Sequence, residues 1–213
     1  YDWGVKGSSD DLIEAYSPQS FLECFGAVYQ AYAEAEGAEG MVFKENNLFD
    51  YAFPLRDYFD QSSFIYLYRD ARDCAASWMN VPMGYSTPLK AARVWSREQK
   101  TCIQLRDVYN PNLVSVSYES LIEEPEETMR KVLTHAGVDV ETACFNTVDK
   151  RKPSSENGRK KNVKNKYLKN TKKPIISSNK KKYRKVFNTE VIRQRETVAQ
   201  DEMIYLGDEL ETS

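Results

Sequence analysis

The stretch FIYLYRDARDCAASW, Phe64 to Trp78, decides the fold of this chain. Its first five residues are aromatic or aliphatic, which is typical of a strand buried on both faces of a parallel sheet. Asp70 and Asp73 then favour the start of a helix that continues through Trp78. Arg69 is therefore predicted to lie between the carboxyl end of a strand and the N–H groups of a helix's first turn, an arrangement that suits an anion site.

The rest of the chain alternates between strand and helix patterns. Apolar runs predict two further strands, which end at Lys44 and Tyr118. Apolar residues at helical spacing, with proline and glycine at the ends, predict helices over 18–36, 54–59, 88–103, 125–136 and 189–206. This alternation indicates one α/β domain over residues 1–213, with a mostly parallel sheet and flanking helices. Ligands of such sheets bind outside the carboxyl ends of the strands, so Lys44, Arg69 and Tyr118 are expected to face one pocket.

The charge of the chain is distributed unevenly. The net charge is −2, but 16 of the 30 lysines and arginines lie between residues 150 and 185, together with one acidic residue, Glu156. The segment 149–185 is rich in Lys, Asn, Ser and Pro and shows no periodicity, so a long surface loop is predicted there. A segment of charge +15 beside a remainder of charge −17 indicates an anionic ligand or partner.

Several classes of protein do not fit the sequence. No run of about 18 apolar residues predicts a transmembrane helix, and no signal-peptide pattern opens the chain. The four cysteines are far apart and lack CxxC pairing, so reduced thiols are expected rather than a zinc site or a disulfide scaffold. The cytoplasm is the favoured compartment. Because residue 1 is Tyr, a targeting signal upstream is also compatible with the sequence, and the oligomeric state stays open.

Four stretches, in chain order, resemble the sulfotransferase family. VFKENN is similar to a strand end that carries a lysine near the transferred sulfuryl group, and FIYLYRDARDCAASW is similar to the family's element for the 3′-phosphate of the donor. VSVSYESLIEEPEETMRKVLTHAGVD resembles the strand and helix that follow. SSNKKKYRKVFNTEVIRQRETVAQDEMIYLGDEL resembles the C-terminal basic loop and closing helix. Together these stretches span about residues 20–210.

The resemblance implies a three-layer fold of the P-loop type and a sulfuryl-transfer activity. The implied donor is 3′-phosphoadenosine 5′-phosphosulfate, the product is adenosine 3′,5′-bisphosphate, and the acceptor is a hydroxyl or an amine that the sequence does not identify. No metal is expected. The basic segment 149–185 would cover the nucleotide, and the helix 189–206 would close the domain. The nucleotide-binding residues that the resemblance implies are Arg69, Ser77, Tyr118, Ser177, Ser178 and Arg184.

Each of these residues also has an ordinary structural interpretation. Arg69 and Ser77, eight residues apart, could grip one phosphate, because a guanidinium binds two oxygens and a hydroxyl donates one hydrogen bond. Alternatively, Arg69 pairs with Asp70 or Asp73. Tyr118 could be a core residue rather than a neighbour of the nucleotide, and Trp78 and Trp95 are expected in the core.

Lys44 is the candidate catalytic residue. A compact positive charge could neutralise the bridging oxygen as the donor phosphate leaves, although a solvated lysine is the alternative. Glu45 is a weaker candidate base, because successive residues of a strand point to opposite faces. His135 is the only histidine. It is rejected as a base, because a histidine near the end of the 125–136 helix is explained by the helix dipole.

One part of the family pattern has no counterpart in the sequence. The 5′-phosphosulfate loop of the family is a turn rich in glycine, serine and threonine after the first strand. GVKGSSDD, from Gly4, is the nearest candidate, but no apolar strand precedes it. We expect the true loop to lie upstream of Tyr1, which would leave this chain inactive when alone.

Two other functions compete with sulfuryl transfer. The segment 150–185, with Tyr167 and Tyr183 among its lysines, could bind nucleic acid. It resembles no nucleic-acid module, and the acidic remainder would repel a duplex, so nucleic acid is not the favoured partner. The third hypothesis is a nucleotide-binding relative that has lost its activity.

Overall fold

The stretch from Phe64 to Trp78 folds as a strand followed by a helix. In the computed structural model, β1 spans Phe64–Tyr68 and α4 spans Ala71–Trp78. β1 pairs in parallel with β2, Leu113–Ser117, in a register that sets the first residues of the two strands side by side. The two carboxyl ends therefore meet at the same edge of the sheet, where Arg69 follows β1.

The structure describes residues 9–42, 44–79, 81, 84–109, 112–142 and 180–212. They belong to two compact units, Tyr1–Ser62 and Ser63–Ser213. Among the described residues, no helix combines the length and apolar character needed to cross a membrane.

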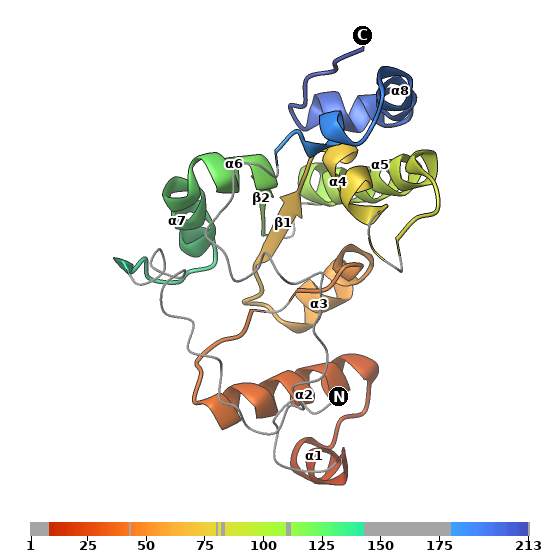
Figure 1. Cartoon of the computed structure of the whole chain (residues 1–213). Helices are drawn as coiled ribbons and strands as arrows, with labels where there is room; N and C mark the ends of the chain where they lie inside the picture. The colour runs from red at the N-terminus through yellow and green to blue at the C-terminus, as the bar shows by residue number, and fades with distance from the viewer. Residues whose placement is uncertain are drawn as a thin grey trace, which may run out of the picture. The chain divides into compact units, whose positions relative to one another are not determined.

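The second unit contains the parallel sheet and the helices that flank it. Between the strands the chain forms α4, α5 (Pro88–Gln104) and the π-helical turn η2 (Leu105–Tyr109). After β2 come α6 (Tyr118–Glu123), α7 (Pro125–His135), the 3₁₀ turn η6 (Lys182–Lys185) and α8 (Thr189–Tyr205). Figure 1 shows α6 and α7 on one side of the strands and α4, α5 and α8 on the other. The predicted α/β class, with a parallel sheet and flanking helices, is confirmed.

Small residues on α4 allow other helices to pack closely against it. Ala71, Ala75 and Ala76 are fully buried, and α5 and α8 contact α4 and each other. Two clusters form the core of this unit: Ala71, Trp95, Ala199 and Met203 in one, and Ala76, Tyr183 and Ile192 in the other. Trp78 packs against the first cluster, so the prediction that Trp78 and Trp95 are core residues is confirmed.

The first unit is helical in the residues described. It contains α1 (Ser9–Tyr16), α2 (Phe21–Glu36), the 3₁₀ turn η1 (Leu48–Tyr51) and α3 (Ala52–Tyr58). Gly37 ends α2 in the left-handed region at φ 63°, as the sequence predicts. The start of α2 differs from the prediction: Ser20, not Ser17, caps the helix. Its side chain accepts a hydrogen bond from the N–H of Glu23, and Glu23 in turn accepts one from the N–H of Gln19.

The predicted strand that ends at Lys44 is wrong. Met41, Val42, Lys44 and Glu45 have no strand structure, and the side chain of Val42 is 83% exposed. A strand is stabilised by ladder hydrogen bonds and by burial of its side chains, and a run of three apolar residues does not secure either. Tyr118 also differs from the prediction, because it begins α6 rather than ending β2.

Candidate functional site

Arg69 and Ser77 face each other, as their spacing predicts. A terminal nitrogen of Arg69 donates to the hydroxyl of Ser77 over 3.4 Å. The other terminal nitrogen lies 3.4 Å from a carboxylate oxygen of Asp73, so one of the predicted ion-pair alternatives is also present. The Arg69 side chain is 19% exposed and that of Asp73 is fully buried. The guanidinium is therefore held in place by α4 but keeps access to solvent.

Two aromatic residues fix the position of Arg69. Its guanidinium carbon lies 4.4 Å from the centre of the Tyr118 ring, within the range of a cation–π interaction. The indole N–H of Trp95 donates to the backbone carbonyl of Arg69 over 2.9 Å. Tyr118 is the first residue of α6 because the hydroxyl of Ser117 caps that helix and accepts from the N–H of Ser120. The structure thus brings Arg69, Ser77 and Tyr118 together.

The start of α4 is not open to an anion in the predicted way. Asp70 caps the helix, and its carboxylate accepts hydrogen bonds from the N–H groups of Arg72 at 2.7 Å and Asp73 at 3.4 Å. A carboxylate already bound to these donors would repel a phosphate at the same place. At this end of the sheet, Arg69 and Ser77 can therefore offer donors to an anion, whereas the first N–H groups of α4 are already occupied.

Arg72 is a buried residue of the site that the sequence analysis missed. It is 3% exposed and forms ion pairs with Asp70, at 2.6 Å, and with Glu196 of α8. Burial alone would lower its pKa, but the hydrogen bonds and charges of these partners raise the pKa above its ordinary value. Glu196 lies 124 residues away in sequence, so no local pattern could predict the pair.

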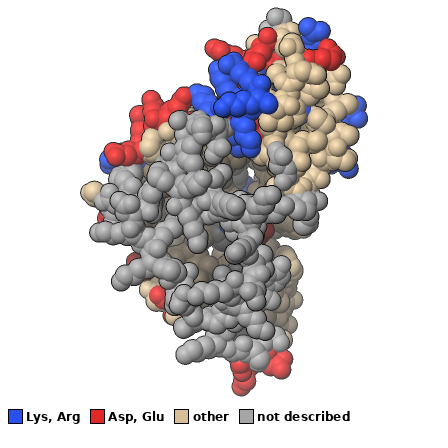
Figure 2. Space-filling view, in the orientation of Figure 1, with Lys and Arg blue, Asp and Glu red and all other residues tan. Residues whose placement is uncertain are grey.

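The turn η6 joins the basic segment to α4. The N–H of Tyr183 donates to Asp73 over 2.9 Å, and the Tyr183 ring is fully buried beneath the guanidinium of Arg72. Arg184, a predicted nucleotide-binding residue, is paired with Glu211. Figure 2 shows lysine and arginine side chains gathered over η6. The basic residues of this patch are Lys180, Lys181, Lys182, Arg184 and Lys185.

A cleft of about 340 Å³ lies between α4, α6, η6 and the C-terminal residues. Its charged lining is mixed: Asp70, Asp73, Glu119, Asp208, Glu209 and Glu211 with Arg72, Lys180, Lys181 and Arg184. Burial, followed by the charges of Asp70 and Glu119, raises the pKa of Asp208 to about 7. Burial raises the pKa of Glu119 as well. The carboxylates of this cleft would repel an anionic ligand. Most of the positively charged side chains in the cleft already pair with carboxylates.

The remaining predicted site residues are Lys44, Ser177 and Ser178. Lys44 belongs to the first unit, where its ammonium group donates to the side chain of Asn46. Ser177 and Ser178 lie outside the described residues. His135 ends α7, and its ring lies 3.0 Å from the carbonyl of Asn112, directly before β2. That position is at the amino end of the strands, so the rejection of His135 as a base is consistent with the structure.

The thiol beside Arg69 is not activated, and the described residues contain no cluster of metal ligands. No group of His, Cys, Asp and Glu side chains there could hold a metal ion. Cys74 is a free thiol beside Arg69, and burial raises its pKa to about 12. A neutral thiol of this kind is a poor nucleophile. The arrangement can bind and orient an anion through Arg69 and Ser77.

This architecture is that of a sulfotransferase fold. A solved structure described as "Sulfotransferase Domain from the Curacin Biosynthetic Pathway" superimposes with a TM-score of 0.62 at 15% sequence identity, and the match covers 94% of this chain and 78% of that one. At this identity the likeness concerns the fold. The search of curated proteins found no match.

The family itself follows from the sequence profile. The profile of the "Sulfotransferase family" matches residues 8–142, more than half of the chain. The chain therefore belongs to the sulfotransferase family, and the resemblance stated from its motifs is confirmed.

Proposed function

We propose that the chain binds 3′-phosphoadenosine 5′-phosphosulfate and serves the transfer of its sulfuryl group to a hydroxyl or an amine. The observation that carries the proposal is the position of Arg69, stacked on Tyr118 with a terminal nitrogen 3.4 Å from the Ser77 hydroxyl. A planar guanidinium with a neighbouring hydroxyl suits a phosphate, because the two groups can donate to different oxygens.

The residues of the cluster have distinct roles in this proposal. Arg69 binds the 3′-phosphate, Ser77 donates a second hydrogen bond to it, and Tyr118 holds the guanidinium in orientation. The bound donor supplies the activated sulfuryl group, whereas the protein supplies charge and position. Asp73 limits the affinity, because its carboxylate competes with the phosphate for Arg69. Lys44 is retained as the candidate catalytic residue on the basis of its sequence motif alone.

The test compares two nucleotides that differ by one phosphate. Adenosine 3′,5′-bisphosphate and adenosine 5′-phosphate are titrated into the wild-type chain and into Arg69→Ala by calorimetry. We expect the variant to bind the bisphosphate about 10- to 150-fold more weakly, a loss of about 1.5–3 kcal/mol, with little change for the monophosphate. Arg69→Lys should recover only part of the affinity, because an ammonium group cannot form the bidentate contact.

Arg97→Ala provides the matched control, because Arg97 is an exposed arginine of α5 in the same unit. It should leave both affinities unchanged. If Arg69→Ala weakens the two nucleotides equally, Arg69 does not recognise the 3′-phosphate and the proposed site is wrong. A duplex DNA titration at about 50 and 200 mM salt tests the nucleic-acid alternative, for which a steep loss of affinity with salt is expected.

A further inference from the structure

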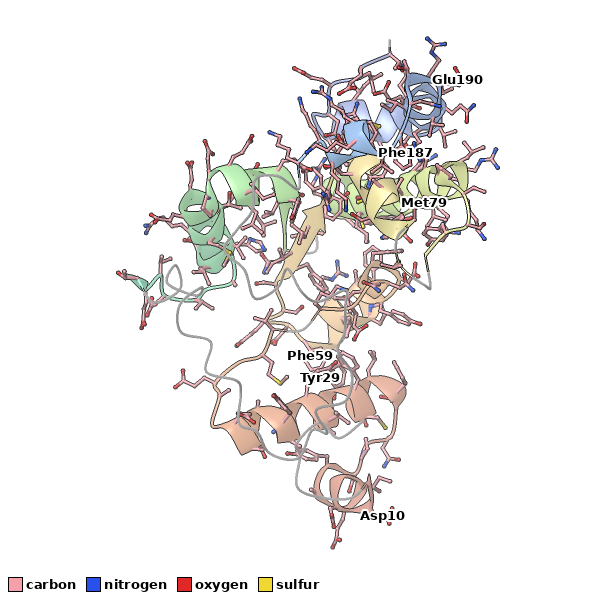
Figure 3. All side chains as sticks on the ribbon, viewed as in Figure 1. Asp10, Tyr29, Phe59, Met79, Phe187 and Glu190 are labelled. Atoms are coloured by element: carbon pink, nitrogen blue, oxygen red, sulfur yellow. The ribbon has the colours of Figure 1, made fainter. Side chains whose placement is uncertain are left out.

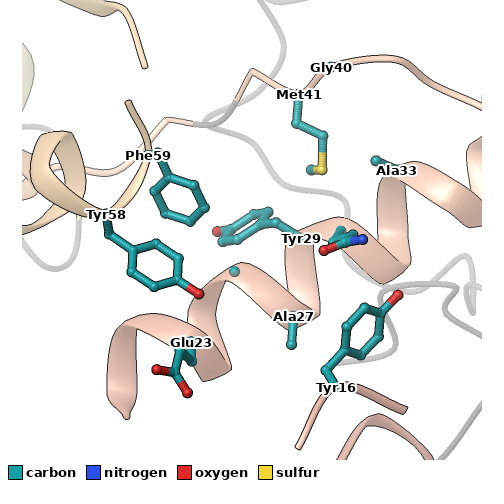
Figure 4. A pocket seen from close by; sticks show the side chains of 11 residues that line it. Tyr16, Glu23, Ala27, Tyr29, Ala33, Gly40, Met41, Tyr58 and Phe59 are labelled. Atoms are coloured by element: carbon teal, nitrogen blue, oxygen red, sulfur yellow. The ribbon is translucent and has the colours of Figure 1, made fainter. Parts of the chain in front are cut away.

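The first unit contains a hollow of about 600 Å³ that the proposed donor site does not use. It lies along α2, is bordered by the end of α3 and by Met41, and is open to solvent (Figure 4). Gly26, Tyr29 and Ala33 line it from α2, because residues three and four apart share one face of a helix. We call this space the aromatic hollow. Its volume falls within the range of small-molecule sites, about 300–1,000 Å³.

Aromatic rings form one wall of the hollow. Tyr58 and Phe59 meet edge to face with ring centres 4.6 Å apart, and Phe59 lies beside Tyr29 between α2 and α3 (Figures 3 and 4). Gly26 allows this approach, since a Cβ there would lie 3.2 Å from the Tyr58 ring and 3.3 Å from the Phe59 ring. Tyr58 is still 43% exposed, so ring surface is available to a ligand.

The charge around the hollow has one sign. Glu23 lines it, and none of the described residues that line it is a lysine or an arginine. The capping contact with the N–H of Gln19, at 2.5 Å, holds the Glu23 carboxylate in position. On another wall the hydroxyl of Tyr16 donates to Glu34 over 2.9 Å. Burial and the negative charge of Glu45 raise the pKa of Tyr29.

We propose that the aromatic hollow binds an arylalkylamine, a cationic amine joined to an aromatic ring. The rings of Tyr29, Tyr58 and Phe59 accommodate the aromatic body, and the Glu23 carboxylate pairs with the ammonium group. Charge complementarity decides between ligands, because a neutral aromatic compound leaves the charge of Glu23 without a cationic partner and an anionic compound is repelled. Naming this amine as the class of the sulfuryl acceptor rests on the proposed function; the binding itself does not.

The experiment uses three phenols of similar size and different charge: tyramine, 4-ethylphenol and 3-(4-hydroxyphenyl)propionate. Each is titrated into the 213-residue chain by calorimetry at neutral pH. Tyramine should bind most tightly, 4-ethylphenol more weakly by about three- to ten-fold, and the propionate most weakly. Equal affinities for tyramine and 4-ethylphenol, or no detectable tyramine binding at millimolar concentration, would overturn the proposal.

Two variants of α2 assign the binding to the hollow. Glu23→Gln keeps the helix cap, because glutamine serves at this position of a capping box, and should weaken tyramine by about three- to ten-fold without affecting 4-ethylphenol. Glu36→Gln is the matched control, since Glu36 is exposed on the same helix and does not line the hollow. Equal effects of the two variants on tyramine would contradict the assignment.

A third variant reduces the space rather than the charge. Gly26→Ala places a methyl group against the Tyr58 and Phe59 rings and should weaken both tyramine and 4-ethylphenol. Unchanged binding of both would place the ligand elsewhere. Adenosine 3′,5′-bisphosphate is titrated into the same samples. If the chain binds the bisphosphate but not tyramine, the proposal for the hollow is wrong and the donor site stands. If it binds tyramine but not the bisphosphate, the donor site is wrong and the hollow stands.

Discussion

Asp70 has two roles, and the second changes what the first residues of α4 can bind. Its carboxylate caps the helix by accepting the N–H groups of Arg72 and Asp73, and it also forms an ion pair with the Arg72 guanidinium. The positive end of the helix is therefore already neutralised within the protein. In the proposed function a phosphate is therefore bound by Arg69, whose side chain lies outside this buried pair. Asp70 and Arg69 are neighbours in sequence but have different ionic partners: Asp70 pairs with Arg72, and Arg69 with Asp73.

Contacts between site residues were predictable from the sequence only where the residues are close in the chain. Arg69 and Ser77 lie on one strand end and the following helix, so a distance of eight residues is enough to bring them together. Arg72 was missed, although a signal existed: an arginine at the second position of a predicted helix, next to Asp73, favours an internal charge pair. The three apolar residues before Lys44 predict a strand, but Met41, Val42, Lys44 and Glu45 have no strand structure.

Asp208 should make stability depend on pH in the opposite direction from an ordinary carboxylate. Its pKa is raised to about 7 by burial and by Asp70 and Glu119, so the native state binds a proton that the unfolded chain releases near pH 4. The free energy of unfolding should fall as pH rises from about 4 to about 7. Asp208→Asn has no such proton to lose. The free energy of unfolding of the variant, relative to wild type, should therefore rise by roughly 1–3 kcal/mol from pH 5 to pH 8.

Urea unfolding of both proteins at pH 5 and pH 8 measures this difference. Asp201→Asn, an exposed residue of α8, serves as the control and should show no such gain. A constant difference between Asp208→Asn and wild type at the two pH values would show that Asp208 is ionised throughout.

At the scale of elements, glycine and proline mark helix boundaries that the sequence predicts correctly. Gly37 and Gly137 adopt positive φ after α2 and α7, and Pro88 and Pro125 occupy the first positions of α5 and α7. The Ser17-Pro18 pattern predicts the start of α2 three residues early, because the helix is capped instead by contacts of Ser20 and Glu23. α6 was missed since the alternating pattern of β2 runs on to Tyr118, and only the cap by Ser117 ends the strand.

The contact between α4 and α8 should depend on Glu196. This residue is 3% exposed and accepts hydrogen bonds from Arg72, from the N–H of Glu211 at 2.9 Å and from Thr212. Glu196→Gln leaves Arg72 with one charged partner in a buried position, and we expect a loss of about 2–4 kcal/mol in the free energy of unfolding.

Chemical denaturation measures the loss, and α8 itself offers the control. Glu190 is exposed and lies 3.6 Å from Arg193, so Glu190→Gln should change stability by less than about 0.5 kcal/mol. If the two variants are equally stable, the buried pair does not hold α4 to α8.

At the scale of the whole molecule, the parallel sheet and its helices were predictable from alternation, but the division into two compact units was not. The prediction of a single domain is untested. The predicted strand at Lys44 would place its neighbours in the sheet domain, whereas the structure assigns Lys44 to a separate compact unit, Tyr1–Ser62. The aromatic hollow was also beyond prediction, because its walls come from α2, from the end of α3 and from Met41, which no sequence period connects.

The two proposed ligands should protect different units from hydrogen exchange. Saturating adenosine 3′,5′-bisphosphate should slow amide exchange most in α4 and α6, and tyramine should slow it most in α2 and α3. A ligand at about 100 times its dissociation constant stabilises its bound state by about 2.7 kcal/mol, enough for a large change in exchange rate. Mass spectrometry of peptic peptides resolves the two units. Protection of the same peptides by both ligands would contradict the assignment of the two sites.

The long separation of Arg72 and Glu196 has a consequence for the growing chain on the ribosome. The two residues are 124 positions apart, so at about 5–20 residues per second roughly 6–25 s pass between their synthesis. During that interval Asp70 is present but α8 is not, and the alanine face of α4 that α8 will cover stays open to water and chaperones. Helix α4, which follows β1, is thus among the last elements to be fully buried in the newly synthesised protein.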